Sequence, residues 1–192
     1  MTALAHYIQT YFGASNDELK HISMLFKSVH LTKGSFFVKA GGIADRLGFV
    51  QSGILREFIE VNDQEVTKWI STQGYFAVDL QGFIFGQPAR WNIQALTDTE
   101  VYVIDLHEYH KIKEMVPRWT ELEKRFIAKC FNVMEDRIVQ HLCLSAEERY
   151  QKLFAFNKEL FNQVPLQYLA SMLGMTPETL SRIRKKTTAH TS

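Results

Sequence analysis

The spacing of apolar side chains changes twice along this chain, and these changes restrict the folds that it can adopt. Apolar residues follow a helical spacing over the first thirty residues, alternate from Leu31 to Leu106, and return to the helical spacing after Pro117. The outer patterns predict amphipathic helices and the middle one predicts β-strands. A continuous run of strands between two helical regions indicates an α+β fold.

The middle stretch has the composition of short strands separated by tight turns. The expected strands are residues 34–39, 47–51, 54–61, 66–70 and 100–104. The turn signals between them are Gly41-Gly42, Ser52-Gly53 and Asn62-Asp63. Strands spaced by about ten residues with such punctuation predict a β-barrel or jelly roll.

The pattern after Pro117 predicts one helix of about 25 residues with two neighbouring apolar stripes. The first stripe consists of Trp119, Leu122, Phe126, Cys130 and Val133. The second consists of Ile127, Phe131, Met134, Ile138 and Leu142. One stripe is expected to pack on the chain's own barrel and the other on a second subunit, and we assign the first stripe to the dimer interface. A core within one chain that covers both stripes is the alternative.

Residues 164–186 predict two short helices joined by a tight turn. Leu166, Leu169, Ala170 and Leu173 give the first helix an apolar face. Gly174 can adopt the positive φ that ends a helix. Thr176 and Pro177 are suited to the cap and first position of the next helix, whose Leu180 and Ile183 would pack on the first.

The outward face of the second helix is polar and ends in a basic run. A helix-turn-helix of this kind can place its second helix in the DNA major groove, whereas an ordinary hairpin with a solvated face is the alternative. Residues 145–192 carry a net charge of +3 and the rest of the chain carries −2, which favours DNA binding over an ordinary hairpin. The candidate DNA-binding residues are Thr176, Glu178, Thr179, Ser181, Arg182, Lys185 and Lys186.

The sequence gives little support for a metal site, a disulfide bond or a membrane-spanning helix. Cys130 and Cys143 are expected to be buried free thiols, and His107 and His110, the only close histidine pair, lack a third ligand. Residues 31–106 contain no histidine, which argues against a cupin-type metal enzyme. No apolar run is as long as a membrane span and no secretion signal begins the chain, so we expect a cytoplasmic protein without a cofactor.

The order of elements, together with specific segments, resembles the cyclic-AMP receptor/Fnr (Crp/Fnr) family of bacterial transcription regulators. Residues 44–53 and 95–104 are similar to its barrel strands, and residues 145–150 and 176–183 are similar to its branch in Bacteroidetes-type bacteria. The resemblance implies an N-terminal jelly roll, a dimerisation helix and a C-terminal helix-turn-helix, here without room for a wing after the second helix. Glu178 and Arg182 match the family's base-reading positions, where they can contact cytosine and guanine. Lys185 and Lys186 would contact phosphates.

The phosphate-binding segment departs from the pattern of the members that bind cyclic AMP. Their Gly-Glu pair and later Arg correspond here to Val78-Asp79 and Ala89, with Arg90 one position further. The loss of a charged contact to a phosphate argues against cyclic AMP as the effector. A different small molecule would lie near Phe76, Asp79, Arg90 and Asn132. The alternative is that the aromatic residues of this region only fill the barrel.

These observations predict three domains and one main function. The domains are a sensor at 1–116, a dimerisation helix at 117–144 and a DNA-binding domain at 145–192. The function is that of a homodimeric regulator that binds an inverted repeat in double-stranded DNA, with a contact to RNA polymerase left open. The alternative is a ligand-binding module that acts through protein partners without binding DNA.

Overall fold

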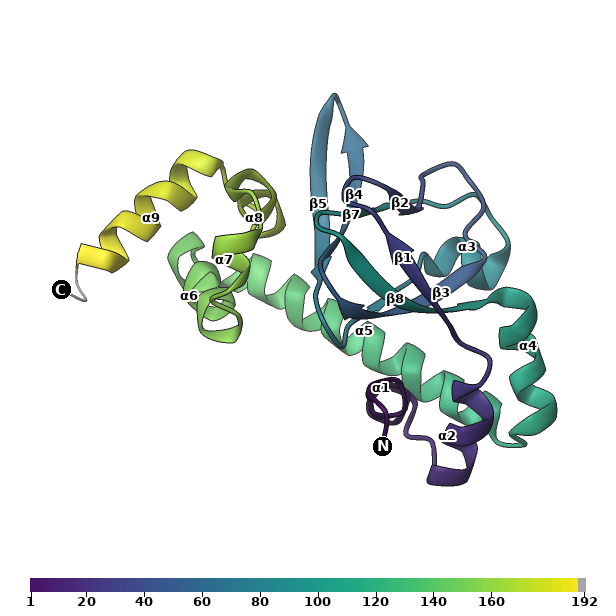
Figure 1. Cartoon of the computed structure of the whole chain (residues 1–192). Helices are drawn as coiled ribbons and strands as arrows, with labels where there is room; N and C mark the ends of the chain where they lie inside the picture. Colours follow the sequence, from purple (N-terminus) through teal and green to yellow (C-terminus); the bar gives the residue numbers. More distant parts are fainter. Residues whose placement is uncertain (190–192) are drawn as a thin grey trace. The chain divides into compact units, whose positions relative to one another are not determined.

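The computed structural model describes residues 1–189 of the 192-residue chain, and Figure 1 shows the order of its elements. The helices are α1 Ala3–Phe12, α2 Asn16–Ser23, α3 Leu80–Phe85, α4 Leu106–Met115, α5 Trp119–Cys143, α6 Ala146–Phe156, α7 Leu160–Gln163, α8 Leu166–Met172 and α9 Pro177–Ala189. The strands are β1 Lys27–Leu31, β2 Phe36–Val38, β3 Arg46–Ser52, β4 Leu55–Val61, β5 Gln64–Ser71, β6 Phe76–Ala77, β7 Asn92–Ala95 and β8 Thr99–Asp105. The predicted α+β class is confirmed.

The strands form a sandwich of two four-stranded sheets, ordered β1-β8-β3-β6 and β2-β7-β4-β5. Apolar side chains of both sheets, such as Val50 and Val101 of the first and Leu55 and Ile93 of the second, share one buried core. Gly48 lets the sheets approach, because an added Cβ would lie 3.1 Å from the ring of Phe37. The alternating pattern of the sequence therefore reflects one face of each strand turned toward this core.

Two local expectations are wrong. Lys27–Leu31 continues the predicted N-terminal helical region in sequence but forms β1, which pairs with β8 over five residues. Helix α3 interrupts the predicted run of strands, and the carboxylate of Asp79, directly before it, caps it by accepting from the backbone N–H of Gly82. In both places, sheet pairing or a single cap decides the structure more strongly than the spacing of apolar residues.

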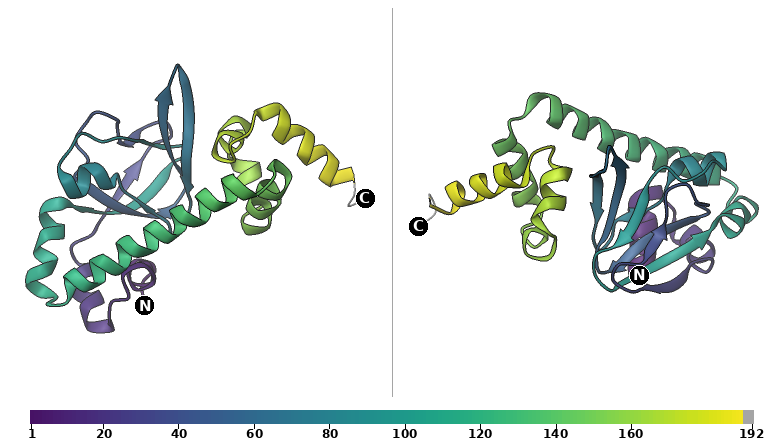
Figure 2. Two further views of the ribbon diagram at one scale, coloured as in Figure 1. Left: turned by 180° about the vertical axis from the view of Figure 1, so that it is seen from behind. Right: turned by 90° about the horizontal axis from the view of Figure 1, so that it is seen from above.

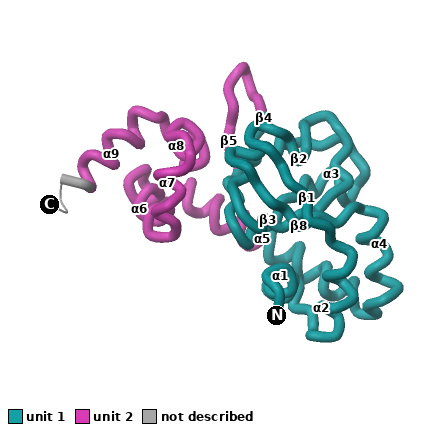
Figure 3. The backbone as a smooth tube through the Cα atoms, viewed as in Figure 1, with its two compact units in different colours: residues 1–59, 69–131 teal, residues 60–68, 132–192 magenta. Residues whose placement is uncertain are grey.

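The described chain divides into two compact units, which Figure 3 shows in different colours. Among the described residues, the first comprises residues 1–59 and 69–131, and the second comprises residues 60–68 and 132–189. The division passes through α5, and it assigns the tip between β4 and β5 to the second unit. The division into three domains at 116/117 and 144/145 stays a prediction.

The first unit has a second core, formed by helices. Figure 2 shows α1 beside the first half of α5, where the ring of Phe12 stacks on Trp119 at 4.9 Å and on Phe126 at 4.6 Å between ring centroids. Trp119, Leu122 and Phe126 are at most 1% exposed. No helix within residues 1–189 is long and apolar enough to cross a membrane.

The buried stripe of α5 corrects the predicted dimer interface. Trp119, Leu122 and Phe126 are buried within their own chain, so these three residues do not offer a surface to a second subunit, and Cys130 is partly buried against the same core. Val133, the fifth residue of the predicted interface, is exposed. Cys143 is also exposed, contrary to the expectation of a buried thiol, whereas Cys130 is partly buried.

Candidate nucleic-acid interface and effector region

Residues 166–189 form two helices joined by a turn, which we call the α8–α9 hairpin. Gly174 in the turn has a φ of 64°, the left-handed conformation expected there. The hydroxyl of Thr176 accepts a hydrogen bond from the backbone N–H of Thr179 at 3.2 Å, and α9 begins at Pro177. The predicted turn, cap and helix start are therefore confirmed.

The two sides of α9 differ in burial. Leu180 and Ile183 are buried, as are Leu169 and Ala170 of α8, so the predicted packing between the helices is confirmed. Four of the candidate DNA-binding residues lie together on the other side, around an open groove. The groove is lined by Leu166, Pro177, Glu178, Ser181, Arg182 and Lys185. Glu178 and Arg182 are fully on the exposed side and Ser181 is half-buried.

The carboxylate of Glu178 has a distinct electrostatic environment. Hydrogen bonds from its own backbone N–H and from the Thr176 hydroxyl lower the pKa of Glu178 below its ordinary value. The first turn of a helix also favours negative charge. Glu178 is thus an anionic acceptor at neutral pH, the form that can accept from the amino group of cytosine.

Two basic residues near the end of α9 interact with the chain itself. The Lys186 ammonium forms an ion pair with Glu147 of α6 at 3.0 Å, so the predicted phosphate contact of Lys186 competes with this pair. The guanidinium of Arg184 lies 5.8 Å from the ring centroid of Phe161. Lys185, in contrast, lines the groove with Glu178 and Arg182. The candidate interface is therefore centred on positions 178–185 of α9.

The predicted effector residues do not form one group. Asp79 is 1% exposed, and its carboxylate accepts from the backbone N–H groups of Gly82 (2.8 Å), Arg90 (2.8 Å) and Trp91 (3.0 Å). These bonds make Asp79 a clamp for the loop that follows α3. The exposed Arg90 guanidinium lies 5.6 Å from the centroid of the Trp91 ring.

The other two predicted effector residues have different surroundings. Phe76 packs edge-on against Tyr11 and Phe126 in the helical core, at 5.2 and 5.1 Å between ring centroids. Asn132 is exposed and belongs to the second compact unit. Phe76 therefore packs on the helical core of the first unit, and its assignment to an effector pocket stays a prediction.

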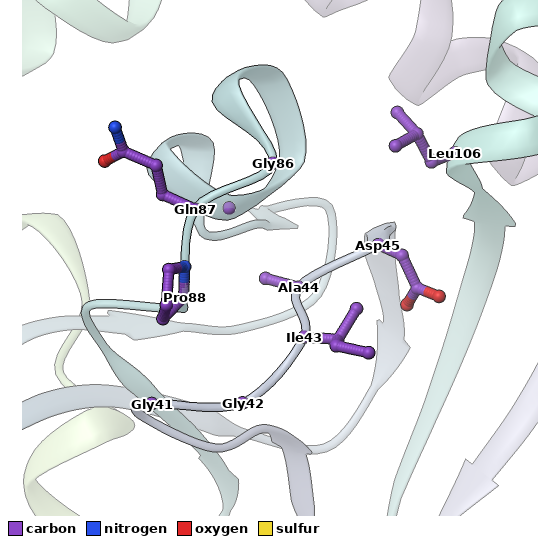
Figure 4. Close-up of a pocket in the computed structure, with 10 residues that line it drawn as sticks. Gly41, Gly42, Ile43, Ala44, Asp45, Gly86, Gln87, Pro88 and Leu106 are labelled. Atoms are coloured by element: carbon purple, nitrogen blue, oxygen red, sulfur yellow. The ribbon is translucent and has the colours of Figure 1, made fainter.

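A cleft that the sequence analysis did not predict lies on the first unit (Figure 4). It separates the loop of residues 41–45 from the end of α3 and the residues that follow, 86–88, with Leu106 at one side. The loops are joined by hydrogen bonds of 2.8 Å from Gly41 N–H to the Ala89 carbonyl and from Ala89 N–H to the Gly42 carbonyl. Gly41 and Gly42 were interpreted only as a turn signal, and no sequence pattern shows that their loop meets residues 86–88.

Two charged residues of β4 were also missed. Arg56 and Glu57 are adjacent in the strand, so alternation predicts one of them on each face, yet they are 1% and 4% exposed. The guanidinium of Arg56 lies 4.2 Å from the ring centroid of Phe58. Both faces of β4 are therefore covered at these positions. Among the described residues, no cluster of three histidine, cysteine or carboxylate side chains is placed to hold a metal ion.

The sandwich corresponds to a known domain. Residues 28–114 match the sequence profile of the cyclic nucleotide-binding domain, and the match extends from β1 into α4. No curated protein sequence matches the chain.

Solved structures extend the similarity beyond this domain. The putative transcriptional regulator of the crp/fnr family from Eubacterium rectale has a TM-score of 0.70 at 18% identity, over 96% of this chain and 88% of its own. The c-di-GMP responsive global regulator CLP of Xanthomonas campestris has 0.69 at 17%, over 92% and 93%. FixK2 from Bradyrhizobium japonicum has 0.70 at 18%, over 86% and 85%. The chain thus shares its fold with Crp/Fnr-type regulators.

Proposed function

We propose that the chain is a DNA-binding transcription regulator of the Crp/Fnr type, in which the α8–α9 hairpin is the helix-turn-helix. The observation that carries this proposal is the groove that joins Glu178, Ser181, Arg182 and Lys185 on one side of α9, opposite the buried Leu180 and Ile183. An acceptor, a guanidinium and an ammonium along one helix face suit base edges and phosphates of a major groove. The fold shared with transcription regulators supports the same conclusion.

We propose that the regulator is a homodimer that uses the second stripe of α5. Phe131, Ile138 and Leu142 are 61%, 58% and 80% exposed, and they follow helical spacing along one side of the helix. Pairing of these faces from two copies would remove this apolar surface from water. Two recognition helices related by a two-fold axis would read an inverted repeat with half-sites about 34 Å apart.

We propose that neither cyclic AMP nor cyclic GMP acts as an effector of this regulator. Ala89 is buried and replaces a phosphate-binding arginine, and the carboxylate of Asp79 is already occupied by three backbone N–H groups. Calorimetric titration should therefore give no binding, or only weak binding, of either nucleotide. A dissociation constant in the low micromolar range would refute this expectation.

The test of the main proposal is selection from random duplex DNA with the full chain, followed by gel shifts over a series of salt concentrations. Arg182→Ala should cost about 1–3 kcal/mol and relax the preference at one base pair of each half-site, because a guanidinium grips guanine through two hydrogen bonds. Lys185→Ala should weaken all sequences about equally and reduce the salt slope by about one. Failure to recover a palindromic motif, or wild-type affinity of Arg182→Ala, would contradict the proposal.

A further inference from the structure

The last carbonyl groups of α8, which lead into the turn of the α8–α9 hairpin, are held by two arginines from other helices. Arg137 of α5 donates from Nη2 to the Met172 carbonyl at 2.6 Å. Arg149 of α6 donates from Nε to the Leu173 carbonyl at 2.8 Å and from Nη1 to the Leu144 carbonyl at 2.6 Å. Because the C-terminus of a helix carries partial negative charge, cations at this position are favourable. These bonds fix the end from which α9 departs.

The tip between β4 and β5, residues 60–68, contacts the same end of α8. The Thr67 N–H donates to the Ser171 hydroxyl at 2.8 Å, and that hydroxyl donates to the Glu65 carbonyl at 3.3 Å. Strand β5 lies at the edge of its sheet, so Ser171 binds backbone groups of an edge strand. The tip is accordingly part of the compact unit that contains α8 and α9 (Figure 3).

Arg137 joins these two sets of contacts. Its Nη1 donates to the Lys68 carbonyl of the tip while its Nη2 donates to Met172 of α8. A planar guanidinium can span two carbonyls in this way, whereas the single ammonium of a lysine cannot hold the same fork. The Arg137 carbonyl in turn accepts from Nδ1 of His141 at 2.9 Å, and the ring of His141 would lie 3.1 Å from a Cβ added at Gly174.

The charge of the tip argues against a contact with nucleic acid. Glu60, Asp63 and Glu65 give this short segment three carboxylates, and Lys68 is its only basic residue. Such a segment would be repelled by phosphates, so its contacts with α8 have a supporting role. By supporting the α8–α9 hairpin, the tip can change DNA affinity without a contact to DNA.

We propose that Arg137 is a positioning residue for DNA recognition, which fixes the end of α8 and binds the tip of residues 60–68 to it. The proposal rests on the proposed function, because the property that Arg137 controls is the presentation of α9 to DNA. It assigns to the acidic tip a role as a support of the helix-turn-helix. Arg137 itself makes no contact with DNA in this arrangement.

The experiment compares full-length wild type with Arg137→Ala, Arg137→Lys and the matched control Arg125→Ala. Arg125 lies on the same helix, belongs to the first compact unit and is paired with Glu121 at 2.8 Å. The affinity for a duplex recovered by selection from random DNA is measured over a salt series. Hydrogen exchange of the Thr67 and Met175 amides reports the tip and the turn, since they donate to Ser171 and to the Ala170 carbonyl.

We expect Arg137→Ala to lower DNA affinity about tenfold or more, as the loss of hydrogen bonds from a charged group predicts. The slope of affinity against salt should not change, because a positioning residue releases no counterion. Both amides should exchange faster, Arg137→Lys should restore only part of the affinity, and Arg125→Ala should resemble wild type. If Arg137→Ala does not fold, as judged by circular dichroism, Arg137→Lys alone decides.

Three results would overturn the proposal. Wild-type affinity of Arg137→Ala would show that the contacts of Arg137 do not position α9. Full rescue by Arg137→Lys would show that a positive charge alone is sufficient. A salt slope reduced by about one would identify Arg137 as a phosphate contact. If wild type itself binds no selected DNA, the proposed function fails and this proposal fails with it, an outcome visible before any variant is measured.

Discussion

The two halves of α5 carry similar apolar side chains in opposite surroundings. Phe126 in the first half is 1% exposed and stacks on Phe12, whereas Phe131, little more than one turn later, is 61% exposed. The first half completes the core of a folded unit. The second half presents a row of apolar side chains to solvent within a single chain, and such a surface typically marks an interface. One continuous helix therefore combines an intramolecular role with a proposed intermolecular one.

The largest expected effect comes from a matched pair of substitutions on either side of this division. Phe126→Ala should lower the free energy of unfolding by about 3–5 kcal/mol, because it removes a ring from a packed core and leaves a cavity. Phe131→Ala should change the unfolding of the monomer by about 0.5 kcal/mol or less, as exposed sites do. Urea unfolding at low protein concentration measures both.

Similar losses of stability in the two phenylalanine variants at low protein concentration would contradict the division of α5 into a buried half and an exposed half. A loss of stability in Phe131→Ala only at high protein concentration would support a dimer contact at Phe131, because a dimer is stabilised by mass action. Phe126→Ala should lose the same free energy at every concentration, since the contacts of its ring are internal to one chain.

A charge in the exposed stripe should separate the subunits. Ile138→Glu places two like charges near the proposed two-fold axis, which costs several kcal/mol and should raise the dimer dissociation constant about 100-fold or more. Sedimentation velocity over a range of concentrations measures this change. Asp136→Asn, an exposed position on the opposite side of the same helix, is the control and should leave the association unchanged. A wild-type chain that remains monomeric at micromolar concentration would contradict the dimer.

The difference between the halves of α5 also explains what the sequence could and could not predict. Helical spacing identified both stripes, but periodicity carries no information on which stripe another element covers. The partner of the first stripe is α1, whose Phe12 comes more than a hundred residues earlier. The packing of Phe76 on Tyr11 was not predicted for the same reason, because it depends on that distant helix.

Features determined by neighbouring residues were predicted well. The positive φ of Gly174, the Thr176 cap and the inward side of α9 depend on a few adjacent positions, and all were expected from the sequence. The clamp formed by Asp79 depends on Arg90 and Trp91, eleven and twelve residues away. The contacts of Arg137 connect segments much further apart. Local chemistry therefore indicated the candidate interface, and only the fold revealed what supports it.

The smallest expected effect concerns an ion pair at the start of the buried half. Arg118, directly before α5, donates from Nε to Glu18 of α2 at 2.6 Å and from Nη2 at 2.9 Å. The side-chain hydrogen bonds from Arg118 are the main cause that lowers the pKa of Glu18 to about 2. Because the folded pKa is depressed, the pair stabilises the fold above the pKa of Glu18 in the unfolded chain. This contribution is lost as the pH falls toward the folded pKa.

Glu18→Gln should therefore lower the free energy of unfolding at neutral pH by about 1 kcal/mol or less, since Arg118 is partly exposed and solvent weakens the pair. The difference between variant and wild type should stay constant from pH 7 to about pH 5 and shrink as the pH falls further toward about 2. Thermal unfolding of both proteins over this pH range measures it, with Asp17→Asn, an exposed neighbour, as the control. A difference that stays constant down to the lowest pH would show that the charge of Glu18 does not secure the first half of α5. The stability of that half would then come from the packing of Trp119, Leu122 and Phe126 alone.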